Sequence, residues 1–139
     1  MIEAALLVRA GRVRVGLPVS QLQAVTDPTP VVPVPSTEPS LAGVSTVRGA
    51  MLPVISLHLL LGEPPEANSG MFVVVEVDGR ALCLAVDEAE TLLRGDPLPL
   101  PPDADMPWAR AVLRDGGAFV PLLDLEALAD RLSETGRLT

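Results

Sequence analysis

A short hydrophobic motif occurs twice in the chain, and the distance between its copies limits the folds that the sequence can adopt. Each copy consists of Gly-Ala, two apolar residues, Pro, two apolar residues, Ser or Asp, and Leu, at 49–57 and 117–125. The same spacing recurs in other pairs: Gly11-Arg12 with Gly79-Arg80, and Val44 with Val112. Since these matches share one spacing, we predict two divergent copies of one structural unit.

Each copy has the pattern of about five short strands and a closing helix. The first opens with an apolar hairpin, passes through a proline-rich segment from Asp27 to Pro39, and ends in a strand pair hinged at Arg48-Gly49. Proline cannot donate to a β ladder, so the segment from Asp27 to Pro39 is expected to cross the surface as an extended loop. Ser56 and its counterpart Asp124 suit helix N-caps. Many short strands at regular spacing are typical of small barrels.

A spacing of three residues between Val19, Leu22 and Val25 predicts one helical turn that leads into a strand. The corresponding residues of the second copy have the same spacing: Val86, Ala89 and Leu92. We therefore expect the same turn in both halves.

The length of 139 residues suits one domain that buries a sizeable core. We expect two subdomains, at about 1–63 and 70–139, joined by the segment 63–70, which is rich in Pro, Asn, Ser and Gly. Each half alone is too small for a stable core. The two units should therefore share one.

Composition excludes several kinds of partner. The formal net charge is −8 with only ten basic residues, whereas nucleic acids and anionic membrane surfaces require basic patches. No apolar run approaches the ~20 residues that span a bilayer, and the N-terminus lacks a signal peptide pattern. We expect a cytoplasmic protein whose partner is another protein or a small ligand, with no nucleic acid partner and no insertion into a membrane.

No catalytic constellation is visible in the sequence. The one histidine, His58, begins a short Leu-rich helix without a motif around it, and the one cysteine, Cys83, has the surroundings of a core residue. A metal site needs clustered ligands at set spacings, and Asp103-Ala104-Asp105 in a proline-flanked loop is better explained as a solvated turn.

A second acidic group invites an acid–base interpretation, because Asp87, Glu88 and Glu90 directly follow a predicted strand. An exposed acidic turn explains these residues more simply. We therefore predict that the protein is not an enzyme and that it binds no metal and no cofactor.

The first copy of the motif also resembles a known family. The run Gly43-Val44-x-x-Val47-Arg48-Gly49-x-x-Leu52-Pro53-Val54-Ile55-x-Leu57 is similar to the signature of the CheW-like domain, and the resemblance continues through 81–87 and 120–128. It implies a fold of two tandem five-stranded SH3-like barrels with short helices around one core. This agrees with the duplication inferred from the residues.

The resemblance implies an adaptor without catalysis, which joins the cytoplasmic tip of a chemoreceptor to the regulatory domain of a CheA-type histidine kinase. Receptor contact is implied in a groove between the barrels, and kinase contact on the barrel sides. The groove walls correspond here to six residues: Leu22, Gly43, Val44, Arg48, Val86 and Leu92.

Three positions differ from the family pattern. Thr46 replaces a usual Asn, Ser56 replaces a usual Asp, and Ala24 replaces a Glu that commonly pairs with the arginine matched by Arg48. Arg48 must then pair with Asp27 or a backbone carbonyl, or be exposed.

Two alternatives follow from these departures and from the composition. The chain could be a divergent scaffold of a motility or signalling cluster that engages only the kinase or only the receptor. It could also be a small-ligand module that uses the cleft between the barrels.

Overall fold

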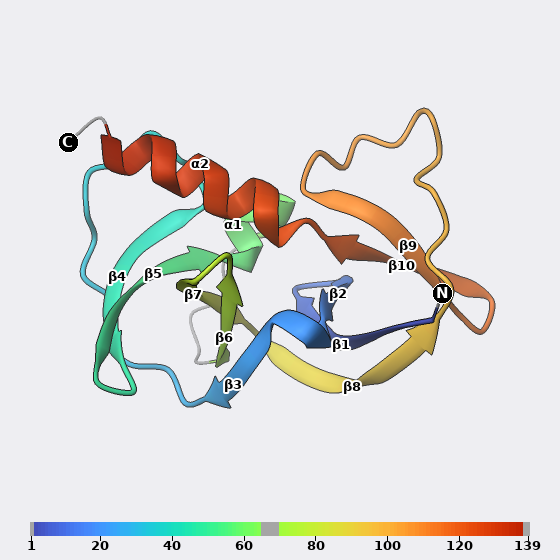
Figure 1. The fold of residues 1–139 in the computed structure, drawn as a ribbon, viewed down its shortest axis with the longest axis horizontal. Helices are drawn as coiled ribbons and strands as arrows, with labels where there is room; N and C mark the ends of the chain where they lie inside the picture. Colours follow the sequence, from blue (N-terminus) through green and yellow to red (C-terminus); the bar gives the residue numbers. More distant parts are fainter. Residues whose placement is uncertain (1, 65–69, 138–139) are drawn as a thin grey trace.

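The computed structural model describes residues 2–64 and 70–137, and within them the chain folds into two five-stranded sheets with short helices (Figure 1). The first half contains β1 (Glu3–Ala10), β2 (Val13–Pro18), the 3₁₀ turn η1 (Val19–Gln21), β3 (Leu22–Thr26), β4 (Leu41–Val47), β5 (Ala50–Ser56) and α1 (Leu57–Leu61). The second half contains β6 (Met71–Val77), β7 (Arg80–Val86), β8 (Glu88–Gly95), β9 (Ala109–Asp115), β10 (Ala118–Leu123) and α2 (Leu125–Arg137).

The element order confirms the predicted repeat. The starts of β9, β10 and α2 follow those of β4, β5 and α1 at the spacing that separates Gly117 from Gly49. Backbone contacts follow the same rule, since Ser56 N donates to Ser40 O and the equivalent Asp124 N donates to Trp108 O. The mainly β fold, with two five-stranded sheets, is as predicted.

The two sheets do not follow the two halves of the chain. One has the strand order β8-β1-β2-β10-β9 and the other β3-β6-β7-β5-β4, so each takes strands from both halves. Parallel pairs join the halves, at β2–β10 in the first sheet and at β5–β7 in the second. The segments 1–63 and 70–139 are therefore repeats in sequence, and the prediction that each forms its own barrel needs this correction.

Apolar side chains form three clusters that account for this arrangement. One small cluster lies within each sheet, around Leu113 and Leu122 in one and around Val54 and Phe72 in the other. The largest cluster draws on strands of both sheets and on both helices, with Leu17, Ile55, Val75, Leu84, Leu123 and Leu128 among its buried members. The shared core predicted from the sequence is thus the largest part of the interior.

Local signals explain where the elements end. Arg48 and Gly49 form the β4–β5 turn with φ of 51° and 83°, a conformation that glycine adopts readily. Ser56 caps α1 by accepting a hydrogen bond from Leu59 N at 3.3 Å, and Asp124 caps α2 by accepting one from Ala127 N at 3.1 Å. The predicted caps are confirmed.

The proline-rich segment from Asp27 to Pro39 is extended, as predicted, and one residue of it is tied to β4. Val32 and Val44 exchange two backbone hydrogen bonds of 2.8 and 2.9 Å. The helical turn predicted twice occurs only once, as η1, because 88–95 form the strand β8. Pairing of β8 with β1 overrides the local spacing. The link predicted at 63–70 lies mostly outside the described residues.

Figure 1 shows α2 lying across the sheet that contains β4 and β5, although the helix directly follows β10 of the other sheet. Its residues Leu125, Leu128 and Ala129 are buried in the shared core. The helix therefore joins the two sheets on one side of the molecule.

Candidate interaction surfaces

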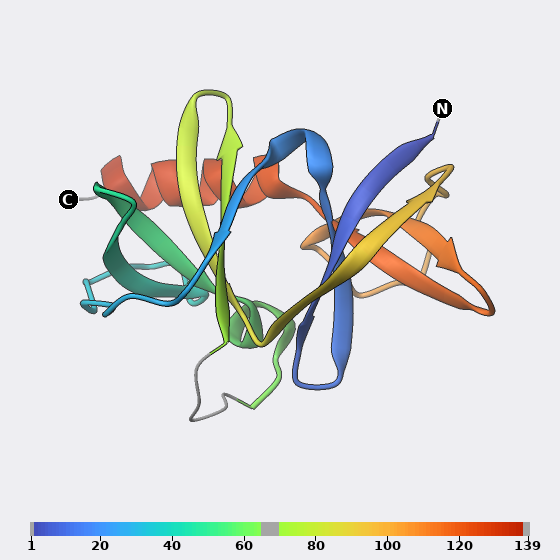
Figure 2. The same cartoon turned by 90° about the horizontal axis from the view of Figure 1, so that it is seen from below.

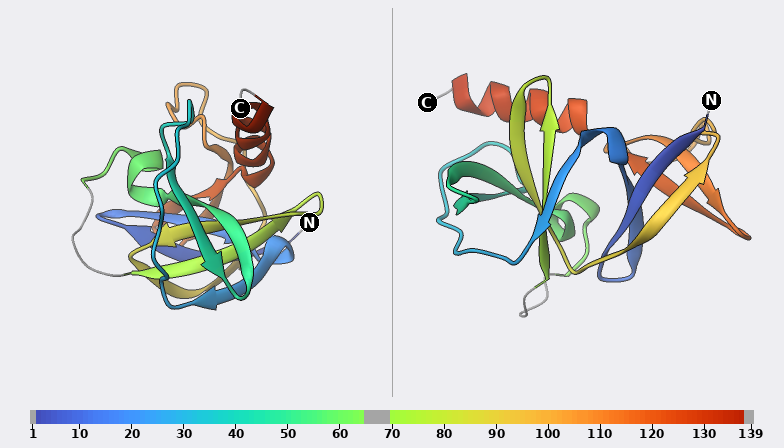
Figure 3. Two further views of the ribbon diagram at one scale, coloured as in Figure 1. Left: turned by 90° about the vertical axis from the view of Figure 1, so that its left-hand side faces the viewer. Right: turned by 60° about the horizontal axis from the view of Figure 1, so that its bottom comes forward.

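The first candidate surface lies along β3 and β8, which are edge strands of different sheets. Figure 2 shows both strands on the same side of the molecule, and the right-hand view of Figure 3 agrees. Val25 on β3 and Leu92 on β8 are exposed, Leu92 to 54%, and Leu22 on β3 is half-buried against the shared core. We call Leu22, Val25 and Leu92 the edge-strand face.

Val86 ends β7 directly before this face but is only 3% exposed. It belongs to the shared core, against which half-buried Ala89 of β8 also packs. The sequence placed it in a groove wall, where its exposed surface is too small for direct contact with a partner.

The second candidate surface lies on β4, β5 and the proline-rich segment. Val32 and Met51 are exposed to 61% and 70%, and with half-buried Val44 they line a shallow depression of about 300 Å³. Thr29, Pro30, Ser45 and Thr46 complete the lining. We call Val32, Val44 and Met51 the β4 shelf.

Gly43 explains how the shelf is held together. It is buried, with φ of +154°, and a Cβ at this position would lie 2.1 Å from Val32 O. Only glycine allows the proline-rich segment to approach β4 this closely. Gly43 therefore positions Val32 and Val44 and presents no side chain to a partner.

Arg48 is exposed in the β4–β5 turn. Within 2–64 and 70–137 the structure records no hydrogen bond or ion pair for it. Of the three situations that the sequence left open, exposure is the observed one. Ala24, which stands where the family has Glu, packs against the small cluster that includes Val47.

The six residues predicted to line one groove are thus divided into two groups. Leu22, Val86 and Leu92 belong to the region of the edge-strand face, whereas Gly43, Val44 and Arg48 lie on β4 and its turn. The strands β3 and β4 form opposite edges of their sheet. These residues therefore belong to two candidate surfaces, and contact with a partner stays a prediction for each of them.

Sequence reasoning missed Val25, Val32 and Met51. Strand alternation carries a signal for Met51, because Leu52 and Val54 are buried while Met51 and Pro53 are more exposed. Phe119 occupies the equivalent place in β10, is exposed, and lies under Arg114 at 5.6 Å. Val32 could not be found this way, since the segment around it has no alternation.

A polar cluster lies where the chain passes from β7 to β8. Asp87 accepts hydrogen bonds of 2.7 Å from Gly11 N and from His58 Nε2, and Arg9 lies 3.8 Å from its carboxylate. Burial tends to raise the pKa of Asp87, but the hydrogen bonds from His58 and Gly11 and the charge of Arg9 outweigh it and hold that pKa below its ordinary value. We call Arg9, Gly11, His58 and Asp87 the crossover cluster.

The crossover cluster corrects the interpretation of 87–90 as an exposed acidic turn. Asp87 is mostly buried, while Glu88 pairs with Arg9 at 3.0 Å and Glu90 pairs with Arg14 at 2.8 Å. These pairs join β8 to the β1–β2 hairpin, and they explain why acidic residues follow one another here.

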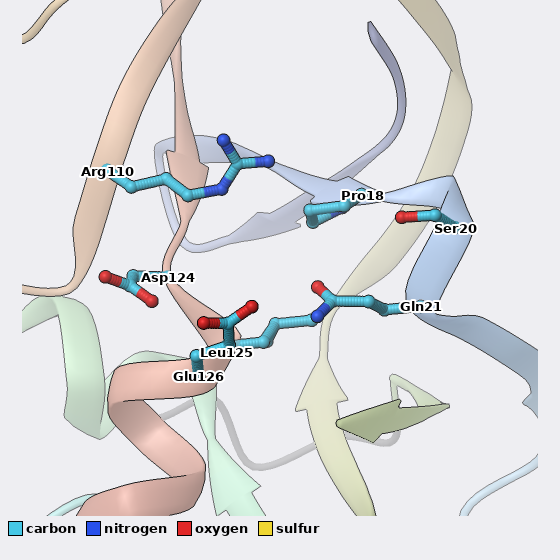
Figure 4. A pocket seen from close by; sticks show the side chains of 7 residues that line it. All are labelled: Pro18, Ser20, Gln21, Arg110, Asp124, Leu125 and Glu126. Carbon is cyan, nitrogen blue, oxygen red and sulfur yellow. The ribbon is translucent and has the colours of Figure 1, made fainter. Parts of the chain in front are cut away.

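A third hollow of about 330 Å³ lies between η1 and the start of α2 (Figure 4). Figure 4 shows Arg110 and Gln21 extending into it from opposite sides. Asp124 and Glu126 contribute carboxylates, of which Asp124 already caps α2, and Arg110 pairs with Glu3. The lining of this hollow is therefore polar and of mixed charge, and Ser20, Gln21 and Glu126 add to it.

Metal-ligating side chains and the cysteine are the remaining chemical groups of the sequence. Across 2–64 and 70–137, no group of three or more His, Cys, Asp or Glu is placed to hold a metal ion. Cys83 is buried, which raises the pKa of its thiol to about 12. None of the helices in the described part of the chain is long and apolar enough to cross a membrane.

Two joined five-stranded sheets with exposed apolar side chains form an arrangement that suits protein interaction. Comparison with known proteins makes this specific: the profile of the CheW-like domain family matches residues 4–133. The chain belongs to the CheW-like domain family, whose members are scaffold and adaptor proteins of chemotaxis.

Two curated relatives are similar over most of the chain. The chemotaxis protein CheW of Rhizobium meliloti (strain 1021) is 28% identical over 110 residues, and the probable chemotaxis protein CheW of Rhizobium etli is 30% identical over 108 residues. Each match covers 72% of this chain and 70% of the relative.

Among solved structures, the scaffolding protein TtCheW of Thermoanaerobacter tengcongensis has the same fold. The TM-score is 0.78 at 19% identity, over 89% of this chain and 90% of the other. The resemblance drawn from Gly43 to Leu57 is therefore confirmed at the level of the family and the fold.

Proposed function

We propose that this protein is a non-catalytic adaptor of the cytoplasm that couples chemoreceptors to a CheA-type histidine kinase. One observation carries the proposal. A single body with a shared core exposes apolar side chains on two separate surfaces, the edge-strand face and the β4 shelf. An adaptor needs two such surfaces, because its partners must bind at the same time.

The edge-strand face is the proposed receptor site. Exposed Val25 and Leu92, with Leu22 behind them, offer apolar contacts along two strands of different sheets. The tip of a receptor is a helical hairpin, whose apolar residues recur on one side and can lie between such strands. Apolar anchors at the centre of an interface carry most of its energy.

The β4 shelf is the proposed kinase site. Met51 is an adaptable apolar side chain on a strand, and Val32 adds apolar area from the proline-rich segment. The shelf lies on the side of one sheet, which leaves the edge-strand face accessible.

Replacement of Leu92 by Asp tests the receptor site. A charge buried against an apolar partner loses its hydration, so we expect the affinity for a receptor tip to fall by about thirtyfold or more, which corresponds to ~2 kcal/mol. Isothermal titration with a purified receptor hairpin measures the effect, and binding of the kinase regulatory domain should be unchanged.

Leu59→Asp is the matched control, because Leu59 is a similarly exposed leucine on α1, outside both surfaces. It adds the same charge and should leave both affinities as they are. Equal losses in the two variants would mean that net charge, not the edge-strand face, determines binding, and the receptor site would have to be abandoned.

A scaffold that engages one partner is the second candidate, and the exposure of Arg48 favours it. The family pattern pairs this arginine with a Glu at position 24, whereas Ala24 packs into an apolar cluster and cannot pair with it. Kinase binding without receptor binding by the unaltered chain would support this candidate.

A further inference from the structure

In the described part of the chain, the backbone crosses from one sheet to the other at two places, and these places are equivalent in the repeat. The chain crosses between β2 and β3 through η1, and between β7 and β8 through Asp87. The spacing of the repeat matches Asp87 with Val19, and His58 with Glu126. The two crossovers therefore occupy equivalent positions but have different chemistry.

The β7–β8 crossover is fixed from several sides. Asp87 N donates a hydrogen bond to Arg9 O at 2.8 Å. The Asp87 carboxylate accepts hydrogen bonds from Gly11 N and His58 Nε2, both at 2.7 Å. Arg9 Nη1 donates a hydrogen bond to Gly11 O in the β1–β2 turn at 2.7 Å. Gly11 and Arg9 belong to one sheet, whereas His58 on α1 directly follows β5 of the other. The cluster thus connects the two sheets through one carboxylate.

The η1 crossover lacks these connections. Val19 cannot accept a hydrogen bond with its side chain, and the equivalent of His58, Glu126, is exposed. Beside them lies the hollow of about 330 Å³ between η1 and α2 (Figure 4). The β7–β8 crossover is therefore filled with paired polar groups, whereas a solvent-accessible hollow lies beside the η1 crossover.

At this buried position, His58 costs more free energy than an apolar residue of similar size would. It is 7% exposed, and its Nδ1 has no hydrogen-bond partner among the described residues. A buried polar atom without a partner costs free energy, and a leucine of similar size would avoid that cost. An ionised carboxylate only accepts hydrogen bonds, so Nε2 must donate to Asp87. The imidazole thus supplies one directed bond and leaves its other nitrogen unsatisfied.

We propose that the His58–Asp87 pair is a latch that fixes the angle between the two sheets at the β7–β8 crossover. His58 and Asp87 are positioning residues: they hold the start of β8, and so set where Leu92 stands relative to β3. The η1 crossover offers no comparable polar restraint, so removal of the latch should widen the range of angles that the shared core and α2 still allow. Only the consequence for receptor binding rests on the function proposed above.

Residual dipolar couplings of backbone amides test the latch directly, because they report the relative orientation of the two sheets in solution. One alignment tensor should fit both sheets of the unaltered protein. In His58→Leu, which keeps the volume and loses the donor, the two sheets should require different tensors. His58→Gln, whose amide can still donate to Asp87, should restore a single tensor.

Ser40→Ala is the control for a general loss of stability. Ser40 is buried and donates to Glu38, away from both crossovers, so this variant should keep one tensor. If His58→Leu does not fold, His58→Met replaces it in the same comparison. A single tensor for both sheets in the variant without the donor would overturn the proposal.

The unique histidine gives a second readout. A long-range proton–nitrogen spectrum should show a proton on Nε2 of the imidazole, and a proton on Nδ1 alone would contradict the latch. In the binding arm, His58→Leu should weaken receptor affinity at least fivefold, with recovery in His58→Gln and no change in Ser40→Ala. If the unaltered protein does not bind a receptor, the proposed function fails, while the couplings still decide the latch.

Discussion

Residues 1–70 expressed alone are expected to show no cooperative thermal unfolding. Within this fragment, β1 and β2 lose their partners β8 and β10, and β5 loses β7. Much of the shared core also comes from the second half, including Val75, Leu84 and Leu123. Without these strands and side chains the fragment cannot bury enough apolar surface to offset its conformational entropy. Circular dichroism during heating measures the outcome.

The complementary fragment, residues 70–139, should behave in the same way for the same reason. An equimolar mixture of the two is the control, and we expect it to regain β structure because every missing strand is then supplied. A sharp transition in either fragment alone would mean that each half folds by itself, contrary to the strand order of the two sheets.

Gly43→Ala should destabilise the protein by about 3 kcal/mol or more, as the sum of backbone strain and lost hydrogen bonds. The added Cβ would lie 2.1 Å from Val32 O, so the proline-rich segment must move away from β4. The paired hydrogen bonds between Val32 and Val44 would then break. Denaturant titration gives the free energy of unfolding.

Gly49→Ala separates the two causes. Gly49 also has a positive φ, of 83°, but nothing lies within 4 Å of a Cβ placed there. Strain alone should cost about 1 kcal/mol. Equal losses at Gly43 and Gly49 would show that close approach of Val32 contributes nothing, and the account of the β4 shelf would then be wrong.

Much of the fold could be predicted from a single spacing. The motif copies at 49–57 and 117–125 indicated where the closing strands and helices of both halves lie, because the same turns and caps recur at that spacing. Ser56 and Asp124 marked the helix starts through their side-chain oxygens. These signals are local, so neighbouring residues of the sequence suffice to predict them.

The exchange of strands between the sheets could not be predicted in this way. It depends on the parallel pairs β2–β10 and β5–β7, in which residues such as Val54 and Cys83 meet only in the folded chain. An apolar strand carries the same pattern whichever sheet it joins. The crossover at Asp87 was misread for a related reason, since its partners Gly11 and His58 are remote in sequence.

The residues predicted for the site differ in exposure, and their contact with a partner stays a prediction. Leu92 is exposed, whereas Gly43 and Val86 are buried. Similarity to a family identifies positions that matter, but it does not distinguish a residue that touches a partner from one that shapes the surface. Exposure in the structure makes that distinction.

The most direct test of the account is the formation of a ternary complex, measured by analytical ultracentrifugation of this protein with a kinase regulatory domain and a receptor tip. We expect one species that contains all three. Leu92→Asp should leave only the complex with the kinase, and Met51→Asp only the complex with the receptor. Competition between kinase and receptor for the unaltered protein, or loss of both partners in either variant, would contradict an adaptor with two separate surfaces.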